Sequence, residues 1–187
     1  GGAAWANGGW GVRVSDGMTN TIGAAGAGNW IGGNDSITGG GLLISGSTSQ
    51  GNVVRYNRIG ADQAGAAAIA NRDGVVISGA PHNTVGPGNL ISGNERDGVR
   101  IENGAAFGNR IVGNFIGTNA AGDERVSNQR FGVVLETETY SNTVGGLTAA
   151  EGNVISGNGY DGDYASEGGV AIRGSAHQNR LYHNTIG

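Results

Sequence analysis

Arginine and aspartate recur together before a glycine in this sequence, at a spacing that could build a charged surface. Three segments share the pattern: Arg72-Asp73, Arg96-Asp97 and, with the arginine alone, Arg130. If these segments stack, their guanidinium groups would line one edge of the fold at intervals of about 5 Å. Arginine binds carboxylates in bidentate fashion, so such a row could hold an acidic glycan in a groove. The plainer interpretation, which we favour, is a solvated edge on which Arg–Asp pairs relieve like-charge repulsion.

A second group of carboxylates falls within one long turn. Asp161, Asp163 and Glu167 stand at i, i+2 and i+6. Ca²⁺ prefers oxygen ligands of this kind, so the segment is a weak candidate for a calcium site. It lacks the further ligands of an EF-hand loop, and an ordinary acidic surface loop is the plainer interpretation. We expect no other cofactor.

Six short motifs of the form Asn-x-Ile place a variable residue between the asparagine and the isoleucine. These middle residues should face outward, and four of the six are apolar: Trp30, Arg58, Leu90, Phe115, Val154 and Thr185. An apolar stripe on an exposed sheet must be covered or bind something. We favour cover by the chain's own turns, such as residues 60–73. The alternatives are lateral association with a partner and stacking of Trp30 and Phe115 on sugar rings.

The elements that would position these residues are repeats. The segment Gly152–Asn158 (GNVISGN) has close copies at Gly88–Asn94 and Gly28–Asn34. Two further motifs, Gly-apolar-x-apolar and Asn-x-apolar, also occur six times each and always in the same order. Apolar residues at i and i+2 are typical of a strand and too closely spaced for a helix face. The chain therefore consists of six rounds, each with three short strands and three turns.

One round cannot bury three apolar strips by itself. If each round stacks on the next at about 4.8 Å, the strips become continuous ladders and the backbones pair between rounds. The sequence therefore predicts an all-β fold, a parallel β-helix (solenoid) of about six three-stranded coils, forming a single domain over residues 1–187. The turn between the second and third strands is alternately long and two residues short. This alternation groups the coils into three two-coil repeats.

Asparagine stands at the same place in twelve of these motifs. Its side chain tolerates sharp turns, and stacked amides can bond to one another along a ladder, so we interpret these residues as structural. The chain has 40 glycines, no cysteine and a net charge of −4 without a basic run. This charge pattern makes nucleic acid an unexpected partner. No segment approaches the length that would span a bilayer.

The repeat motifs resemble the right-handed parallel β-helix of the pectate-lyase-like superfamily. More narrowly, Asn142–Gly146 (NTVGG), Gly152–Asn158 and Gly113–Thr118 (GNFIGT) are similar to repeat arrays of large bacterial surface or secreted proteins. The superfamily includes lyases, hydrolases, epimerases, adhesins and passive stalks, so the resemblance implies the fold more firmly than an activity. The acidic motifs of its polygalacturonase-like enzymes and the Asp-Pro-His motif of its alginate epimerases do not occur here. No catalytic residue is carried over.

The expected function is a structural or adhesive module outside a bacterial cell, without enzymatic activity. The alternative is a carbohydrate-active or carbohydrate-binding β-helix that acts on an acidic polysaccharide. Residues 5–11 match residues 126–132 in phase, and neither end shows a cap. We therefore expect copies to stack end to end as filaments, or further repeats of a longer chain to adjoin these coils.

Overall fold

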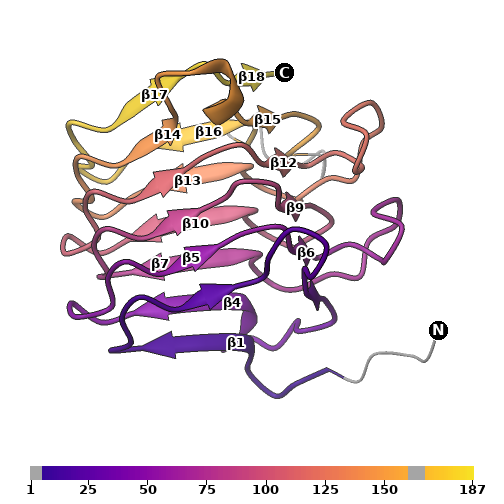
Figure 1. Cartoon of the computed structure of the whole chain (residues 1–187), viewed down its shortest axis with the longest axis horizontal. Helices are drawn as coiled ribbons and strands as arrows, with labels where there is room; N and C mark the ends of the chain where they lie inside the picture. The colour runs from indigo at the N-terminus through magenta and orange to yellow at the C-terminus, as the bar shows by residue number, and fades with distance from the viewer. Residues whose placement is uncertain (1–5, 160–166) are drawn as a thin grey trace.

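The chain coils into a stack of three-stranded rounds. The computed structural model describes residues 6–159 and 167–187, and Figure 1 shows its coils rising in sequence order from β1 to β18. Three parallel sheets of six strands each run along the stack, which confirms the predicted right-handed parallel β-helix of about six coils. The other regular element of the described chain is a short 3₁₀ turn, η1 (Ala149–Glu151). None of the described helical segments has the length and apolarity needed to cross a membrane.

Each coil gives one strand to each sheet, and neighbouring strands in a sheet come from successive coils. The first sheet contains β1 (Trp10–Ser15), β4 (Gly40–Ser45), β7 (Val75–Ser78), β10 (Val99–Glu102), β13 (Val133–Leu135) and β16 (Val170–Ile172). The second contains β2 (Thr21–Ile22), β5 (Val53–Val54), β8 (Thr84–Val85), β11 (Arg110–Ile111), β14 (Thr143–Gly145) and β17 (Arg180–Tyr182). The third contains β3 (Trp30–Ile31), β6 (Arg58–Ile59), β9 (Leu90–Ile91), β12 (Phe115–Ile116), β15 (Val154–Ile155) and β18 (Thr185–Ile186).

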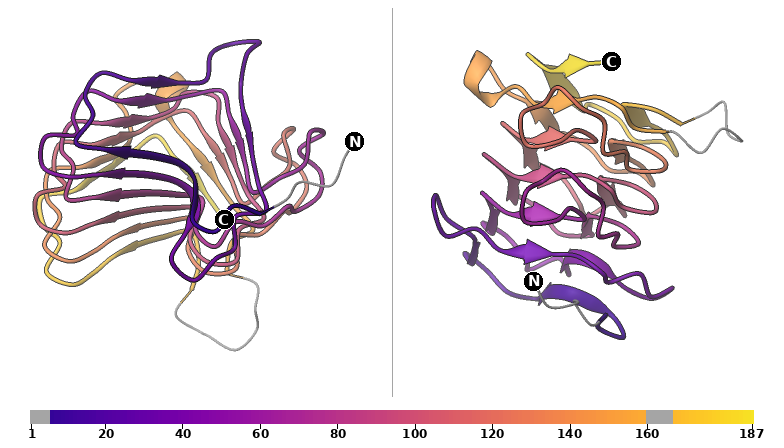
Figure 2. Two further views of the ribbon diagram at one scale, coloured as in Figure 1. Left: turned by 90° about the horizontal axis from the view of Figure 1, so that it is seen from below. Right: turned by 90° about the vertical axis from the view of Figure 1, so that its right-hand side faces the viewer.

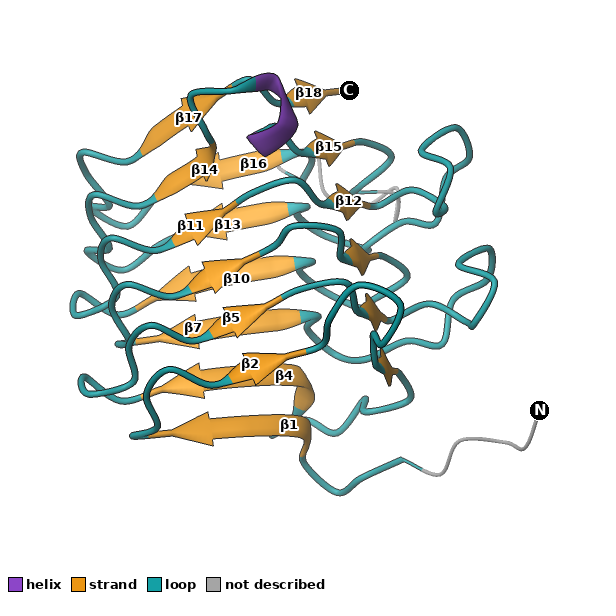
Figure 3. Cartoon of the chain, viewed as in Figure 1, coloured by secondary structure: helices purple, strands orange, loops and turns teal. Residues whose placement is uncertain are grey.

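The core is a set of aliphatic ladders between the three sheets, whose strands are drawn stacked coil upon coil in Figure 3. In the register of the third sheet, Ile59, Ile91 and Ile116 lie directly above one another. All three are fully buried. The predicted inward positions of the first and second sheets are equally buried from the second coil to the fifth. Identical branched side chains stack well at the strand spacing, because every coil presents the same shape to the next.

Asparagine ladders run along two of the corners, as predicted. Between the first and second sheets, each side-chain amide donates to the amide oxygen of the next coil over 2.9–3.4 Å. That ladder comprises Asn20, Asn52, Asn83, Asn109, Asn142 and Asn179. The corner between the second and third sheets repeats the arrangement over 2.8–3.2 Å with Asn29, Asn57, Asn89, Asn114, Asn153 and Asn184.

A third asparagine ladder lies where the chain leaves the third sheet, and the sequence motifs did not predict it. Its amides are 2.7–3.1 Å apart from coil to coil: Asn7, Asn34, Asn71, Asn94, Asn128 and Asn158. Most of the interior ladder amides also donate to a backbone carbonyl of the preceding coil, as Asn114 does to Val85 at 3.0 Å. The ladders therefore satisfy backbone groups that the turns would otherwise leave buried and unpaired.

Two loops project from the side of the stack at the height of the second and fourth coils (Figure 1). We call residues 61–68 the first finger loop and residues 118–125 the second finger loop. Each is closed at its base by an antiparallel bridge, Ala61 to Ala68 and Thr118 to Arg125. The view along the stack in Figure 2 shows both loops leaving the same corner. Both follow the third strand of their coil, at a spacing of two coils that agrees with the predicted two-coil repeat.

Candidate functional site

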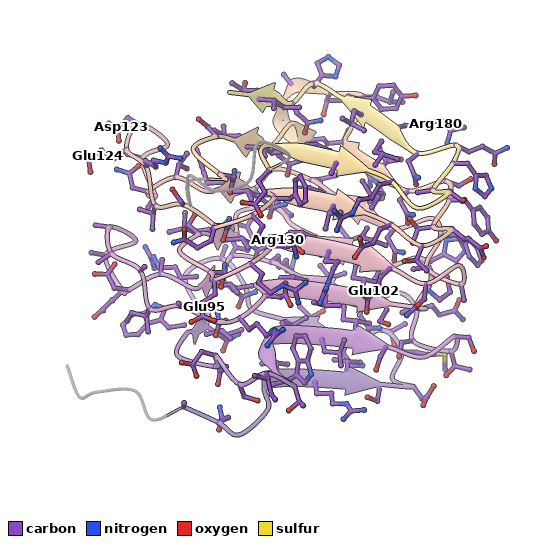
Figure 4. The ribbon with its side chains drawn as sticks, turned by 180° about the vertical axis from the view of Figure 1, so that it is seen from behind. Glu95, Glu102, Asp123, Glu124, Arg130 and Arg180 are labelled. Carbon is purple, nitrogen blue, oxygen red and sulfur yellow. The ribbon has the colours of Figure 1, made fainter. Side chains whose placement is uncertain are left out.

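The three arginines of the repeated pattern stack in register, as the sequence predicts. The N–H of Arg96 donates to the carbonyl of Arg72 at 2.8 Å, and the N–H of Arg130 donates to that of Arg96 at 3.1 Å. They stand on successive coils at the edge where the chain enters the first sheet, and we call these three residues the arginine row. Figure 4 shows Arg130 on this face, with Glu102 on the strands and Glu95 nearer the turns.

The aspartates beside the row are not on a solvated edge, and that part of the prediction was wrong. Asp73 is 1% exposed and Asp97 is fully buried. Each carboxylate takes the place of a backbone acceptor for the next coil: Asp73 Oδ1 accepts the N–H of Asp97, and Asp97 Oδ1 accepts the N–H of Phe131, both at 3.3 Å. This position directly before the strand draws the side chains in against the sheet.

Arginines from later coils lie against these buried carboxylates. Arg100 donates to Asp73 at 2.9 Å, and the Arg96 guanidinium lies 3.6 Å from the same carboxylate. Arg130 lies 4.0 Å from Asp97 and 3.4 Å from Glu167. Each of these arginines thus reaches the aspartate of the preceding coil. The sequence patterns did not single out Arg100, although its place as the variable residue of a Gly-apolar-x-apolar motif shows that it faces outward.

Asp97 is the electrostatically unusual member of the cluster. Burial raises the pKa of its carboxyl above the ordinary value, the negative charge of Asp73 raises that pKa further, and Arg130 only partly offsets both. Its Oδ2 atom has no hydrogen-bond partner within the described part of the chain. A charge in this position is poorly stabilised, so the protonated form of Asp97 is favoured over a wider pH range than that of an exposed aspartate.

Arg72 breaks the pairing rule of the row. The residue that corresponds to Asp73 and Asp97 on its preceding coil is Gly40, which has no carboxylate. Within residues 6–159 and 167–187, no Asp or Glu lies within ion-pair distance of the Arg72 guanidinium. The ring of Trp10 lies across Gly40, where an added Cβ would come within 2.7 Å of it. The row therefore has a partly exposed guanidinium without a carboxylate of its own.

The remaining candidate residues lie elsewhere. Trp30 and Phe115 are on the third sheet, so the structure does not bring them together with the arginine row. Trp30 is 56% exposed. Asp161 and Asp163 lie outside the described residues, and Glu167 is engaged with Arg130. Among the residues whose placement is described, no group of three or more His, Cys, Asp or Glu side chains could hold a metal ion.

One further cluster was missed by the sequence motifs, at the corner between the first and second sheets. The rings of Phe107 and Tyr140 stack at 5.0 Å, Tyr140 stacks on His177 at 5.4 Å, and His82 meets Phe107 edge to face at 4.9 Å. The rings of Phe107, Tyr140 and His177 are nearly parallel, and His82 adds an edge-to-face contact at one end of this stack. The cluster stabilises the turns from coil to coil and does not resemble a catalytic triad.

Comparison with known proteins supports the architecture. A crystal structure of a double mutant of the periplasmic alginate epimerase AlgG superposes with a TM-score of 0.66 at 18% sequence identity. The match covers 94% of this chain and 36% of the epimerase chain, so this chain spans about a third of that protein. At this identity the likeness establishes the fold alone. No protein-family model and no curated protein sequence matches the chain.

Proposed function

We propose that this β-helix binds an acidic polysaccharide along the arginine row on the outer edge of the first sheet. The observation that carries the proposal is Arg72, a half-buried guanidinium in register with two paired arginines but without a carboxylate partner among the described residues. Guanidinium groups bind sugar carboxylates in bidentate fashion, and here their spacing is that of the coils, about 4.8 Å. A polymer that carries regularly spaced carboxylates suits such a row.

The buried aspartates hold part of this surface rigid before any ligand arrives. Asp73 lies within ion-pair distance of Arg96 and Arg100, and Asp97 of Arg130. A side chain that is already ordered loses less conformational entropy on binding. The paired arginines would orient a glycan, and Arg72 would supply the uncompensated positive charge. The proposal concerns binding rather than turnover, because the carboxylates of Asp73 and Asp97 are shielded from a ligand on the surface.

The fold neighbour gives additional support to a carbohydrate ligand. That protein is an alginate epimerase of the periplasm, and alginate is an acidic polysaccharide. Polymers of this kind occur outside the cytoplasm, so the proposal includes a site of action at the cell surface or beyond it. Sugar recognition on a β-helix does not require that the two proteins share an activity.

Calorimetric titration of Arg72→Gln with uronic-acid oligosaccharides tests the proposal. The probes are trimers of galacturonate, mannuronate, guluronate and glucuronate. A charged hydrogen bond contributes about 1.5–3 kcal/mol, so the variant should bind the preferred trimer roughly tenfold or more weakly, and added salt should weaken wild-type binding. Arg180→Gln on the second sheet is the matched control and should bind as the wild type does. Equal affinity of Arg72→Gln and wild type, or no binding of any trimer, would overturn the proposal.

A second candidate function is a structural module of an extracellular assembly. The observation in its favour is that three sheets and three asparagine ladders run without a break from coil to coil, so that each coil is bonded to the next at every corner. End-to-end stacking of copies stays a prediction from the phase of the repeats. Sedimentation velocity over a range of concentrations tests it, because a stacking protein must show larger species as the concentration rises.

A further inference from the structure

The outer face of the third sheet contains a recess of about 490 Å³. Its lining residues come from four successive coils and include Trp30, Tyr56, Arg58, Leu90 and Phe115. This volume is within the range of small-ligand sites. The recess is separate from the arginine row, because none of the three arginines lines it.

Two exposed aromatic residues stand at the open side of the recess. Trp30 is 56% exposed and Tyr56 is 39% exposed. The ring of Tyr56 lies against Gly88, where an added Cβ would be only 2.5 Å from its Cδ1 atom. Gly88 thus allows the tyrosine ring to lie close to the backbone. Broad aromatic faces that water covers are costly in a monomer and are characteristic of binding surfaces.

The finger loops cover the inner part of the same stripe but not Trp30. Gly65 of the first finger loop packs on Leu90, which is 5% exposed, and Gly122 of the second packs on the ring of Phe115. The prediction that the chain's own turns cover the stripe is therefore confirmed at Leu90. At Trp30 it was wrong, since this side chain stays largely exposed.

Arg58 gives the recess a positive charge beside the indole ring. In the register of the third sheet it is the neighbour of Trp30, and no carboxylate of the described residues lies within ion-pair distance of it. The nearby Asp62 accepts the N–H groups of Ala66 and Ala67 at 2.8 and 3.2 Å. These bonds are the main reason why the pKa of Asp62 is lowered, and Arg58 contributes less.

We infer that this recess is a second carbohydrate site, which takes one uronic-acid residue of a polysaccharide. The apolar face of the pyranose ring packs on Trp30, and the sugar carboxylate binds Arg58. The indole ring matches the apolar face of a uronate, and the neighbouring guanidinium matches its carboxylate. A neutral sugar has no carboxylate to pair with Arg58. A concave recess of about 490 Å³ also suits a single sugar ring better than the flat core of a protein interface. This site is independent of the proposed role of the arginine row.

The experiment follows the fluorescence of Trp30. In a Trp5→Phe/Trp10→Phe background Trp30 is the remaining tryptophan, so a titration reports this recess alone. The four uronate trimers named above serve as probes, with maltotriose as the neutral probe. We expect a saturable change with at least one uronate trimer, at an affinity at least about tenfold higher than for maltotriose. No change with any uronate trimer up to ~10 mM would overturn the inference.

Calorimetry on single variants separates the two contributions. Trp30→Ala should lose at least about tenfold in affinity at this site, and Arg58→Gln should remove the preference for the uronate over maltotriose. Circular dichroism should show both variants folded, because Trp30 is exposed and Arg58 lies on the outer face. Arg72→Gln should leave the Trp30 fluorescence response intact, so failure of the arginine-row proposal can be told from failure of this one. Wild-type affinity and selectivity in both variants would refute the second site.

Discussion

Asp97 lies on the coil directly after Asp73, and its N–H donates to the Asp73 carboxylate at 3.3 Å. The two residues have the same type and the same burial, but their partners differ. Asp73 accepts a 2.9 Å bond from Arg100, whereas Asp97 Oδ2 lacks a hydrogen-bond partner among the described residues. One carboxylate is thus well compensated and the other is not. This difference makes the pair a sensitive test of the electrostatics of the first sheet.

Asp73→Asn and Asp97→Asn should have opposite consequences at pH 7. Asp73→Asn should lower the free energy of unfolding by about 2–3 kcal/mol, because it removes the closer counter-charge of the largely buried Arg100 and leaves it with Glu102 at 3.5 Å. Asp97→Asn should be neutral or stabilising, because it removes a poorly compensated charge. Urea denaturation of both variants provides the measurement. A loss for Asp97→Asn as large as that for Asp73→Asn would contradict the raised pKa of Asp97.

The raised pKa of Asp97 gives the stability of the protein a defined pH dependence. The folded-state pKa of Asp97 lies above its unfolded value, so the native state holds the proton more tightly. The contribution of Asp97 to stability is therefore most favourable below about pH 4 and is lost as the pH rises through its raised pKa. Any advantage of Asp97→Asn over the wild type should shrink as the pH falls from 7 to about 4. An advantage that grows on acidification would show the opposite sign of shift.

Asn114→Ala should cost about 2–4 kcal/mol. The side chain of Asn114 donates to Asn153 and Val85 and accepts from Asn89, all in the buried interior of its ladder. Its loss leaves several buried polar groups unpaired at about 1 kcal/mol or more each. Asn29→Ala is the matched control, since Asn29 belongs to the same ladder but is exposed and donates to Asn57 alone. Chemical denaturation should give a loss below about 1 kcal/mol for the control.

Ile91→Asp should unfold the protein or cost more than about 4 kcal/mol, because it buries a carboxylate between Ile59 and Ile116. From the sequence, Leu90→Asp one residue away would be mild. The structure predicts an appreciable loss there too, since the first finger loop covers Leu90. The outward control is Thr185→Asp, at an exposed position of the same column, which should change stability by about 0.5 kcal/mol or less. Thermal melts of the three variants should fall in that order.

Deletion of residues 74–131 should give a shorter β-helix that still folds. The cut removes 58 residues, the third and fourth coils, and joins Asp73 to Gly132 at equivalent points of the repeat. All three asparagine ladders close again, for example by contact of Asn52 with Asn142, because each coil is a nearest-neighbour unit. Deletion of residues 74–114 is the control, since it joins the start of one coil to the third strand of another. Circular dichroism should show a cooperative melt for the first deletion and none for the second.

The sequence predicted those features that depend on short, strict spacing. Residues two apart in a motif face the same side of a strand, so the burial of Ile77, Ile101 and their equivalents followed directly. The two corner ladders followed from asparagines next to those strands. The third ladder did not, because a finger loop places Asn71 and Asn128 twelve residues after Ile59 and Ile116, whereas the other coils place their asparagine three residues after the equivalent isoleucine. An insertion present in only some coils therefore obscures, in the sequence, the fact that these asparagines occupy equivalent positions in the structure.

The candidate site was harder to predict, because its character depends on contacts between coils. The stacking of Arg72, Arg96 and Arg130 could be read from their common distance to a glycine. The raised pKa of Asp97 could not be predicted, since it depends on a neighbouring carboxylate and on arginines that other coils supply. The exposure of Trp30 could not be read from its motif either, since Leu90 has the equivalent position on the third coil and is covered by a finger loop of the second coil. Only the three-dimensional register distinguishes these residues from their equivalents.

The three asparagine ladders share one orientation. In every pair, the side-chain nitrogen of the earlier coil points toward the oxygen of the later coil, as in Asn89 to Asn114 and Asn94 to Asn128. Each carboxamide is a dipole, so three parallel columns of dipoles add along the axis instead of cancelling. The stack is consequently polar, with the amide oxygens of the ladders directed toward its first coil. Any element that continues the ladders, whether more chain or another molecule, must match this polarity and can join in one direction only.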